Sequence, residues 1–326
     1  MLKKQNICLI GGSGRSGTTI LSKIFSNHPE ITDVPEWRFL VDPDGILDFY
    51  TTIDRWSPYH FDLQIKRLQQ LLKKVSRGHP LGFVFLFLNR IGVLDKLPCY
   101  IRPQYANLQA NDFCPEFNRL CSDLIEDLAS FRYRGFWDGM IPIRKCEMAY
   151  NYFPDRKHLA AILSRFLRQV IQRVIKNQNA NYYLEKNTWN ILWFDKILEL
   201  LPEAKLVHIF RDPRDVVASY TKQSWMPSSP EQSALIYKDI INQWISIKQK
   251  IAENCYIEIS LEELVADTRQ VLQNICNFWG IPWSSSLLKV DLSRANSGRW
   301  EKDFNENTQM RVQKILKDVI AYMGYN

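Results

Sequence analysis

A glycine-rich segment at residues 11–19 has the composition of a phosphate-binding loop. It follows a short apolar run at residues 7–10 and leads into apolar residues at helical spacing. A glycine-rich turn between a strand and a helix lets backbone N–H groups converge on a phosphate at the positive end of the helix. The candidate phosphate ligands are Gly14, Arg15, Ser16, Gly17, Thr18 and Thr19.

The cation of this loop is not where a nucleoside triphosphate would require it. The spacing from Gly12 to Gly17 matches a P-loop, but Thr18 stands where an NTP-binding loop carries its lysine. The positive charge is Arg15, inside the loop. We therefore expect the loop to bind a phosphate, but not to bridge the β and γ phosphates of a triphosphate.

A second segment, residues 205–220, also points to an anion. Residues 206–210 form an apolar run that predicts a strand, and Asp212 followed by Pro213 predicts the start of a helix. In a P-loop kinase, such a strand ends in a carboxylate that holds magnesium. Here the first residue after the strand is Arg211, which favours an anion over a metal ion.

Two interpretations of Arg211 are open from the sequence. Ser219 lies about two helical turns further on and would donate a second hydrogen bond to the same anion. Alternatively, Arg211 pairs with Asp215 along one helix face, a contact that contributes only a few tenths of a kcal/mol.

Together the two segments resemble the sulfotransferases that use 3′-phosphoadenosine 5′-phosphosulfate (PAPS). The resemblance implies that the first loop holds the 5′-phosphosulfate, and that Arg211 and Ser219 hold the 3′-phosphate. Residues 182–189 resemble the strand that carries the lysine of the family, here Lys186. Residues 297–300 resemble its late basic loop, which closes over the nucleotide and implies Arg299 as a cofactor ligand. The resemblance covers about residues 5–40 and 180–326.

The run around Glu36 is closest to the branch that contains tyrosylprotein and some carbohydrate sulfotransferases. In the tyrosylprotein branch a Glu-x-Arg supplies the catalytic base, which implies Glu36 followed by Arg38 here. Cytosolic small-molecule sulfotransferases instead use a histidine soon after the lysine, and none follows Lys186 closely. His60 is the alternative base.

The resemblance implies transfer of a sulfuryl group from PAPS to an acceptor hydroxyl, with adenosine 3′,5′-bisphosphate (PAP) as product and no metal. Arg15 and Lys186 would stabilise the leaving oxygen and the sulfonate oxygens. The acceptor stays open between a sugar, a lipid headgroup, a phenol and a peptide tyrosine. Two other functions stay open as well: a P-loop nucleotide kinase or NTPase, and a non-catalytic nucleotide-binding module.

Short strands alternate with longer helices, which predicts an α/β fold with a P-loop-like parallel sheet flanked by helices. The expected strands are residues 7–10, 31–34, 182–184, 206–210 and 255–259. The expected helices of the core are residues 18–27, 189–201, 213–223, 230–254 and 268–280. We predict one domain over residues 1–326, with a nucleotide-binding core at about 5–40 and 180–326. Helical spacing at 63–75, 117–131 and 158–176 predicts a helical insertion at about 41–180 that forms the acceptor side.

Composition limits the partners and the location. The net charge is +7, which suits a polyanionic cofactor, while the 42 lysines and arginines form no dense run that would indicate nucleic-acid binding. Seven irregularly spaced cysteines predict reduced thiols and no metal site. The first strand begins too early for a signal peptide, and the longest apolar run, 81–88, is too short to span a membrane. We therefore expect a cytoplasmic protein without a transmembrane segment.

Overall fold

The computed structural model describes residues 6–52, 55, 57–77, 84, 87, 88, 90, 91, 105, 108–140, 146–153, 155–292 and 297–325. The chain divides into two compact units. The first unit comprises the described residues of Met1–Asp33, Asn181–Leu198 and Pro202–Asn326, and the second those of Val34–Ala180 and Glu199–Leu201. Glu36, which the predicted core boundaries included, is grouped with the second unit.

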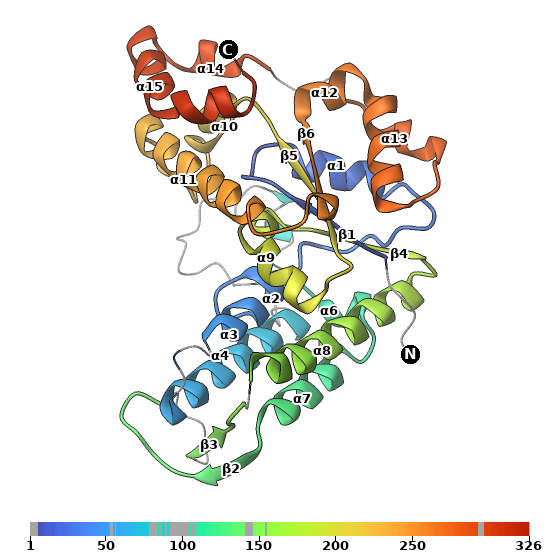
Figure 1. Ribbon diagram of the computed structural model, residues 1–326, viewed down its shortest axis with the longest axis vertical. Helices are drawn as coiled ribbons and strands as arrows, with labels where there is room; N and C mark the ends of the chain where they lie inside the picture. The colour runs from blue at the N-terminus through green and yellow to red at the C-terminus, as the bar shows by residue number, and fades with distance from the viewer. Residues whose placement is uncertain are drawn as a thin grey trace. The chain divides into compact units, whose positions relative to one another are not determined.

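The first unit is built on a parallel sheet with the strand order β4-β1-β5-β6 (Figure 1). The strands are β1 (Asn6–Gly11), β4 (Tyr182–Lys186), β5 (Lys205–Phe210) and β6 (Tyr256–Ser260). Because β1 pairs with β4 on one side and β5 on the other, the order of the strands reverses at β1. In open α/β sheets, ligands bind outside the carboxyl ends of the strands at such a switch point. The predicted fold class is therefore confirmed.

Helices cover both faces of this sheet. Figure 1 shows α1 (Thr18–Phe25), α12 (Leu261–Ala266) and α13 (Thr268–Trp279) on one side. On the other side lie α10 (Pro213–Tyr220), α11 (Pro230–Lys248), α14 (Arg299–Asp303) and α15 (Glu306–Tyr322). The remaining described elements of this unit are α9 (Asn190–Leu200), whose last two residues are grouped with the second unit, and the 3₁₀ turns η4 (Glu253–Cys255) and η5 (Ser285–Lys289).

Burial on both faces explains why the central strands are almost continuously apolar in sequence. Cys8 and Ile10 of β1 pack into a core with Leu21 of α1 and Leu272 of α13. The intervening residues of β1, which point to the opposite face, are buried as well. This double burial fixes β1 in the middle of the sheet, and with it the start of the glycine-rich loop.

The second unit is mainly helical. The helices whose full bounds the described residues give are α2 (Arg38–Val41), α3 (Ile46–Thr52), α4 (Pro58–Arg77), α6 (Ala110–Phe113), α7 (Phe117–Leu128) and α8 (Arg156–Asn177). Rings of Trp37, Phe39, Phe117 and Phe166 pack together in its core. A hairpin of β2 (Phe131–Arg134) and β3 (Glu147–Tyr150) is tied to α4, because Asp62 accepts the backbone N–H of Ala149 at 3.0 Å.

Several sequence predictions of local structure need correction. The expected strand at residues 31–34 is reduced to a single bridge between Ile31 and Tyr182. The helix expected to reach Phe131 ends at Leu128, because the chain turns there into β2, which was not predicted. The apolar run 81–88 lies largely outside the described residues; of its described members, Val84 and Phe87 are exposed and Leu88 is half-buried.

Two further features of the described residues concern the helices and the cysteines. No described helix combines the length and apolarity that a membrane span requires. The six described cysteines, which exclude Cys99, are all free.

Candidate functional site

The segment between β1 and α1 forms a tight turn with three left-handed residues. Gly14, Arg15 and Gly17 have φ angles of 80°, 57° and 107°. Such a backbone turns neighbouring N–H groups toward a common point, an arrangement that binds anions. A Cβ at Gly12 would lie 2.5 Å from Ser16 Oγ and 2.7 Å from the carbonyl oxygen of Ile209, so only glycine lets the loop approach β5 this closely.

The side chains of the loop also fit a phosphate. Ser16 is fully buried, and among the described residues its hydroxyl has no hydrogen-bond partner. Leaving a buried hydroxyl without a partner costs free energy, which a phosphate oxygen would remove by accepting its hydrogen bond. Thr18 is buried at the start of α1, whereas Thr19 is exposed. The loop therefore has the geometry and an available donor for an anion such as a phosphate.

Lys186 is positioned by its strand at the beginning of this loop. It is the last residue of β4 and lies opposite Ile10 of β1. The chain that follows stays attached to β1, because Asn187 donates its backbone N–H to Ile10 at 3.2 Å and Gly12 donates to Thr188 at 3.2 Å. Lys186 therefore lies at the same edge of the sheet as the glycine-rich loop, as parallel pairing requires.

The structure joins the two predicted nucleotide motifs through Arg15 and Ser219. Arg15 Nε donates a hydrogen bond to Ser219 Oγ at 3.0 Å, although 204 positions separate the two residues. Ser219 is buried in α10, while Arg15 is exposed. The loop after β1 and the helix after β5 are thus adjacent. Where they meet, the loop contributes a guanidinium and the helix contributes a hydroxyl group.

Arg211 makes the contact that was the alternative interpretation from the sequence. Its Nη2 donates to Asp215 Oδ2 at 2.9 Å, and both side chains are buried. The side chain of Asp212 caps α10 by accepting the N–H of Arg214 at 2.8 Å, which explains why the helix begins at Pro213. Arg211 is held at the carboxyl end of β5, the position predicted for an anion ligand.

Two aromatic residues near the loop were missed by the sequence reasoning. The buried Tyr220 donates its hydroxyl to the backbone carbonyl of Ser13, and burial raises the pKa of Tyr220, so the hydroxyl keeps its proton. Trp225 packs edge-to-face on Tyr220, with ring centroids 5.7 Å apart, and an atom of its ring lies 3.4 Å from where a Cβ of Gly14 would be. Tyr220 follows Ser219 directly, but nothing in the sequence indicates a contact across 207 positions.

Arg299 starts α14, whose N-cap is Gly298 with a φ of 73°. The Nε of Arg299 donates to Asp303 at 2.7 Å, and the same carboxylate accepts from Lys222 at 2.7 Å. These contacts lower the pKa of Asp303. Arg299 belongs to the first unit, as do Arg15, Lys186 and Arg211.

The two candidate bases belong to the second unit. Glu36 is half-buried and precedes Trp37, the N-cap of α2; its carboxylate lies 4.0 Å from Arg38, which also pairs with Asp42 at 3.5 Å. His60 lies in the first turn of α4, and its Nε2 is buried without a hydrogen-bond partner among the described residues.

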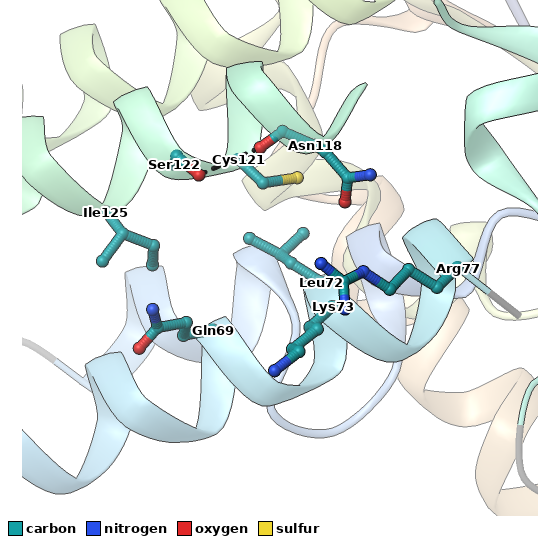
Figure 2. Close-up of a pocket in the computed structure, with 8 residues that line it drawn as sticks. All are labelled: Gln69, Leu72, Lys73, Arg77, Asn118, Cys121, Ser122 and Ile125. Atoms are coloured by element: carbon teal, nitrogen blue, oxygen red, sulfur yellow. Dashed lines mark hydrogen bonds between the residues drawn. The ribbon is translucent and has the colours of Figure 1, made fainter. Parts of the chain in front are cut away.

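Two cavities in the described part of the chain lie apart from these residues. A pocket of about 320 Å³ in the second unit lies between α4 and α7 (Figure 2). It is lined by Gln69, Leu72, Lys73, Arg77, Asn118, Cys121, Ser122 and Ile125. A cavity of about 290 Å³ in the first unit is lined by the amino ends of β1 and β5, opposite to the loops described above. Neither pocket includes a predicted site residue.

Comparison with known proteins identifies the family. A model described as "Sulfotransferase family" matches residues 96–285, more than half of the chain. The chain belongs to the sulfotransferase family. The matched range begins inside the segment 41–180, in which the sequence had suggested no family, and it includes Lys186, Arg211 and Ser219.

A curated relative and solved structures with the same family name are also similar. The chain is 32% identical over 94 residues to a 3-beta-hydroxysteroid sulfotransferase of Cavia porcellus, which covers 24% of this chain and about a third (32%) of that relative. The crystal structure of sulfotransferase STF9 from Mycobacterium avium aligns with 99% of this chain and 78% of its own, at 11% identity and a TM-score of 0.49. The sulfotransferase domain of the Synechococcus PCC 7002 olefin synthase aligns with 97% and 89%, at 18% identity and a TM-score of 0.42.

Proposed function

We propose that this chain transfers a sulfuryl group from PAPS to a hydroxyl group of an acceptor. The observation that carries the proposal is the hydrogen bond between Arg15 and Ser219. It joins the glycine-rich loop to the helix that carries the second nucleotide motif, within a member of the sulfotransferase family. A transfer assay with ³⁵S-labelled PAPS tests the proposal. Because a relative is named for a 3-beta-hydroxysteroid, the acceptor panel begins with hydroxysteroids and continues with phenols, sugars and tyrosine peptides.

In this mechanism the protein supplies charge and orientation, and PAPS supplies the activated sulfuryl group. The N–H groups of residues 14–17, the Ser16 hydroxyl and the threonines at the start of α1 hold the 5′-phosphate. Arg15 and Lys186 direct their charges at the oxygens on which negative charge develops, an electrostatic effect that contributes several kcal/mol when the groups are fixed beforehand. Glu36 accepts the proton of the acceptor hydroxyl.

The 3′-phosphate makes the nucleotide preference testable. We expect adenosine 3′,5′-bisphosphate to bind at least about tenfold more tightly than 5′-AMP, because charge-assisted hydrogen bonds contribute about 1.5–3 kcal/mol each. Arg211→Ala should remove most of this preference and leave the affinity for 5′-AMP nearly unchanged. Isothermal titration calorimetry with both nucleotides measures the effect. Equal affinity of the unsubstituted protein for the two would contradict the proposed function.

A kinase or NTPase is the second candidate, and metal dependence separates it from a sulfotransferase. Arg211 occupies the position where a magnesium-binding carboxylate would follow the strand. We therefore expect binding of adenosine 3′,5′-bisphosphate and sulfuryl transfer to be unchanged by EDTA. The control is the same titration with ATP and magnesium, for which we expect no tight binding. A strict requirement for magnesium would favour the kinase instead. Metal independence and a cytoplasmic location stay predictions until measured.

A further inference from the structure

The buried carboxylate of Asp215 connects two segments that the motifs treat separately. Asp215 lies in the first turn of α10 with an exposed fraction of 0%. Its Oδ2 accepts hydrogen bonds from Arg211 Nη2 at 2.9 Å and from the backbone N–H of Gly298 at 3.0 Å. Its Oδ1 accepts the backbone N–H of Trp300 at 3.0 Å. One carboxylate thus holds both the guanidinium after β5 and the turn that begins α14.

These hydrogen bonds fix the position of the Arg299 backbone. A carboxylate buried away from water requires hydrogen-bond donors, and here the backbone N–H groups on either side of Arg299 supply two of them. Gly298 adopts the left-handed φ of 73° that allows its N–H and that of Trp300 to face the same carboxylate. The backbone of Arg299 is therefore fixed by Asp215, whatever the side chain of Arg299 contacts.

A second set of contacts holds the same arrangement. The guanidinium carbon of Arg214 lies 4.5 Å from the ring centroid of Trp300, a cation–π distance. The same guanidinium donates to both oxygens of Asp212, at 3.0 and 2.7 Å. The segment from Arg211 to Asp215 therefore makes two kinds of contact with the start of α14: the Asp215 carboxylate accepts its N–H groups, and the Arg214 guanidinium stacks on Trp300.

We propose that Asp215 is a positioning residue that aligns Arg211 and Arg299 on the 3′-phosphate of the nucleotide. This inference rests on the proposed function, in which Arg211 holds that phosphate, and on the family resemblance, which implies Arg299 as a ligand of the nucleotide. The expected effect is opposite to that of simple charge repulsion. A carboxylate near a phosphate repels it, so if Asp215 acted only through its charge, removing that charge would strengthen phosphate binding. Positioning means the opposite: without the carboxylate the arginines lose their alignment and phosphate binding weakens.

Asp215→Asn shows whether the carboxylate strengthens or weakens phosphate binding, because the amide keeps the shape of the side chain and removes its charge. We expect the affinity for adenosine 3′,5′-bisphosphate to fall by about tenfold, the equivalent of one charge-assisted bond. The affinity for 5′-AMP should change by less than about twofold, because the 5′-phosphate loop is separate from Asp215. In an Arg211→Ala background, the same substitution should lower the affinity for adenosine 3′,5′-bisphosphate by a smaller factor than it does alone, since part of its effect acts through Arg211.

The control is Asp318→Asn, which also removes one negative charge from the first unit. Asp318 is exposed on α15 and pairs with Lys238 at 3.3 Å, so both nucleotide affinities should be retained. Tighter binding of adenosine 3′,5′-bisphosphate by Asp215→Asn, or an equal loss for both nucleotides, would overturn the positioning role while leaving the function intact. If the unsubstituted protein shows no preference for the 3′-phosphate, the proposed function fails first. Should Asp215→Asn not fold in a thermal melt, Asp215→Glu displaces the carboxylate but keeps its charge, and the same selective loss is expected.

Discussion

Replacing Glu36 by glutamine is expected to lower kcat by about 10²–10⁴, the usual range for a lost general base. Glutamine keeps the shape of the side chain but accepts no proton from the acceptor hydroxyl. The affinity for adenosine 3′,5′-bisphosphate should stay nearly unchanged, because Glu36 is proposed to act on the acceptor hydroxyl and not on the nucleotide. Initial rates with labelled PAPS, together with titration of the nucleotide, give both quantities.

His60→Ala is the matched comparison for Glu36→Gln. If Glu36 is the base, the histidine variant should turn over at nearly the rate of the unsubstituted protein. Normal turnover of Glu36→Gln together with loss of activity in His60→Ala would move the base to His60. In that case the nucleotide site would be unaffected, because neither residue takes part in it.

Lys186→Ala is expected to slow transfer by about 10²–10³, comparable to the loss of one preorganised donor to a developing oxyanion. The physical reason differs from that of Glu36, because Lys186 stabilises charge on the leaving oxygen rather than on the acceptor. The two variants are therefore distinguished by the acidity of the acceptor. A more acidic phenol loses its proton more readily, so it should reduce the defect of Glu36→Gln more than that of Lys186→Ala.

A series of substituted phenols with known pKa values, provided the acceptor screen finds phenols active, gives this comparison directly. For each variant, the logarithm of the rate defect is plotted against the pKa of the acceptor. A clear slope is expected for Glu36→Gln and a shallower one for Lys186→Ala. The reverse order would exchange the roles that we propose for the two residues.

The sequence determined the elements at which the nucleotide motifs lie. Residues 7–10 and, apart from His208, residues 206–210 are apolar because both faces of the sheet are buried, so β1 and β5 could be recognised without the structure. The glycine pattern and Arg15 then marked the loop, and the Asp212–Pro213 cap marked the start of α10. All of these signals are local, since each depends on residues within one turn or one strand.

Other parts of the sequence were less informative. The hairpin of β2 and β3 was missed because Phe131 continues the apolar spacing of α7, and the pairing that makes it a strand comes from residues 147–150. The sequence likewise left two partners open for Arg211. Only the structure showed that Asp215 accepts its hydrogen bond while also holding the turn at Gly298.

What the tertiary structure alone decided is which distant side chains meet. Arg15 donates a hydrogen bond to Ser219, and Tyr220 donates one to the carbonyl of Ser13. Asp215 accepts hydrogen bonds from the N–H groups of residues 298 and 300. The order of the parallel strands places β5 beside β1, although more than 190 residues separate them, and this brings the loop and α10 to the same edge. Strand order is a property of how the sheet assembles around its core. The types of the residues therefore predicted a phosphate-binding chemistry, and the packing of the sheet decided which of the predicted residues lie together.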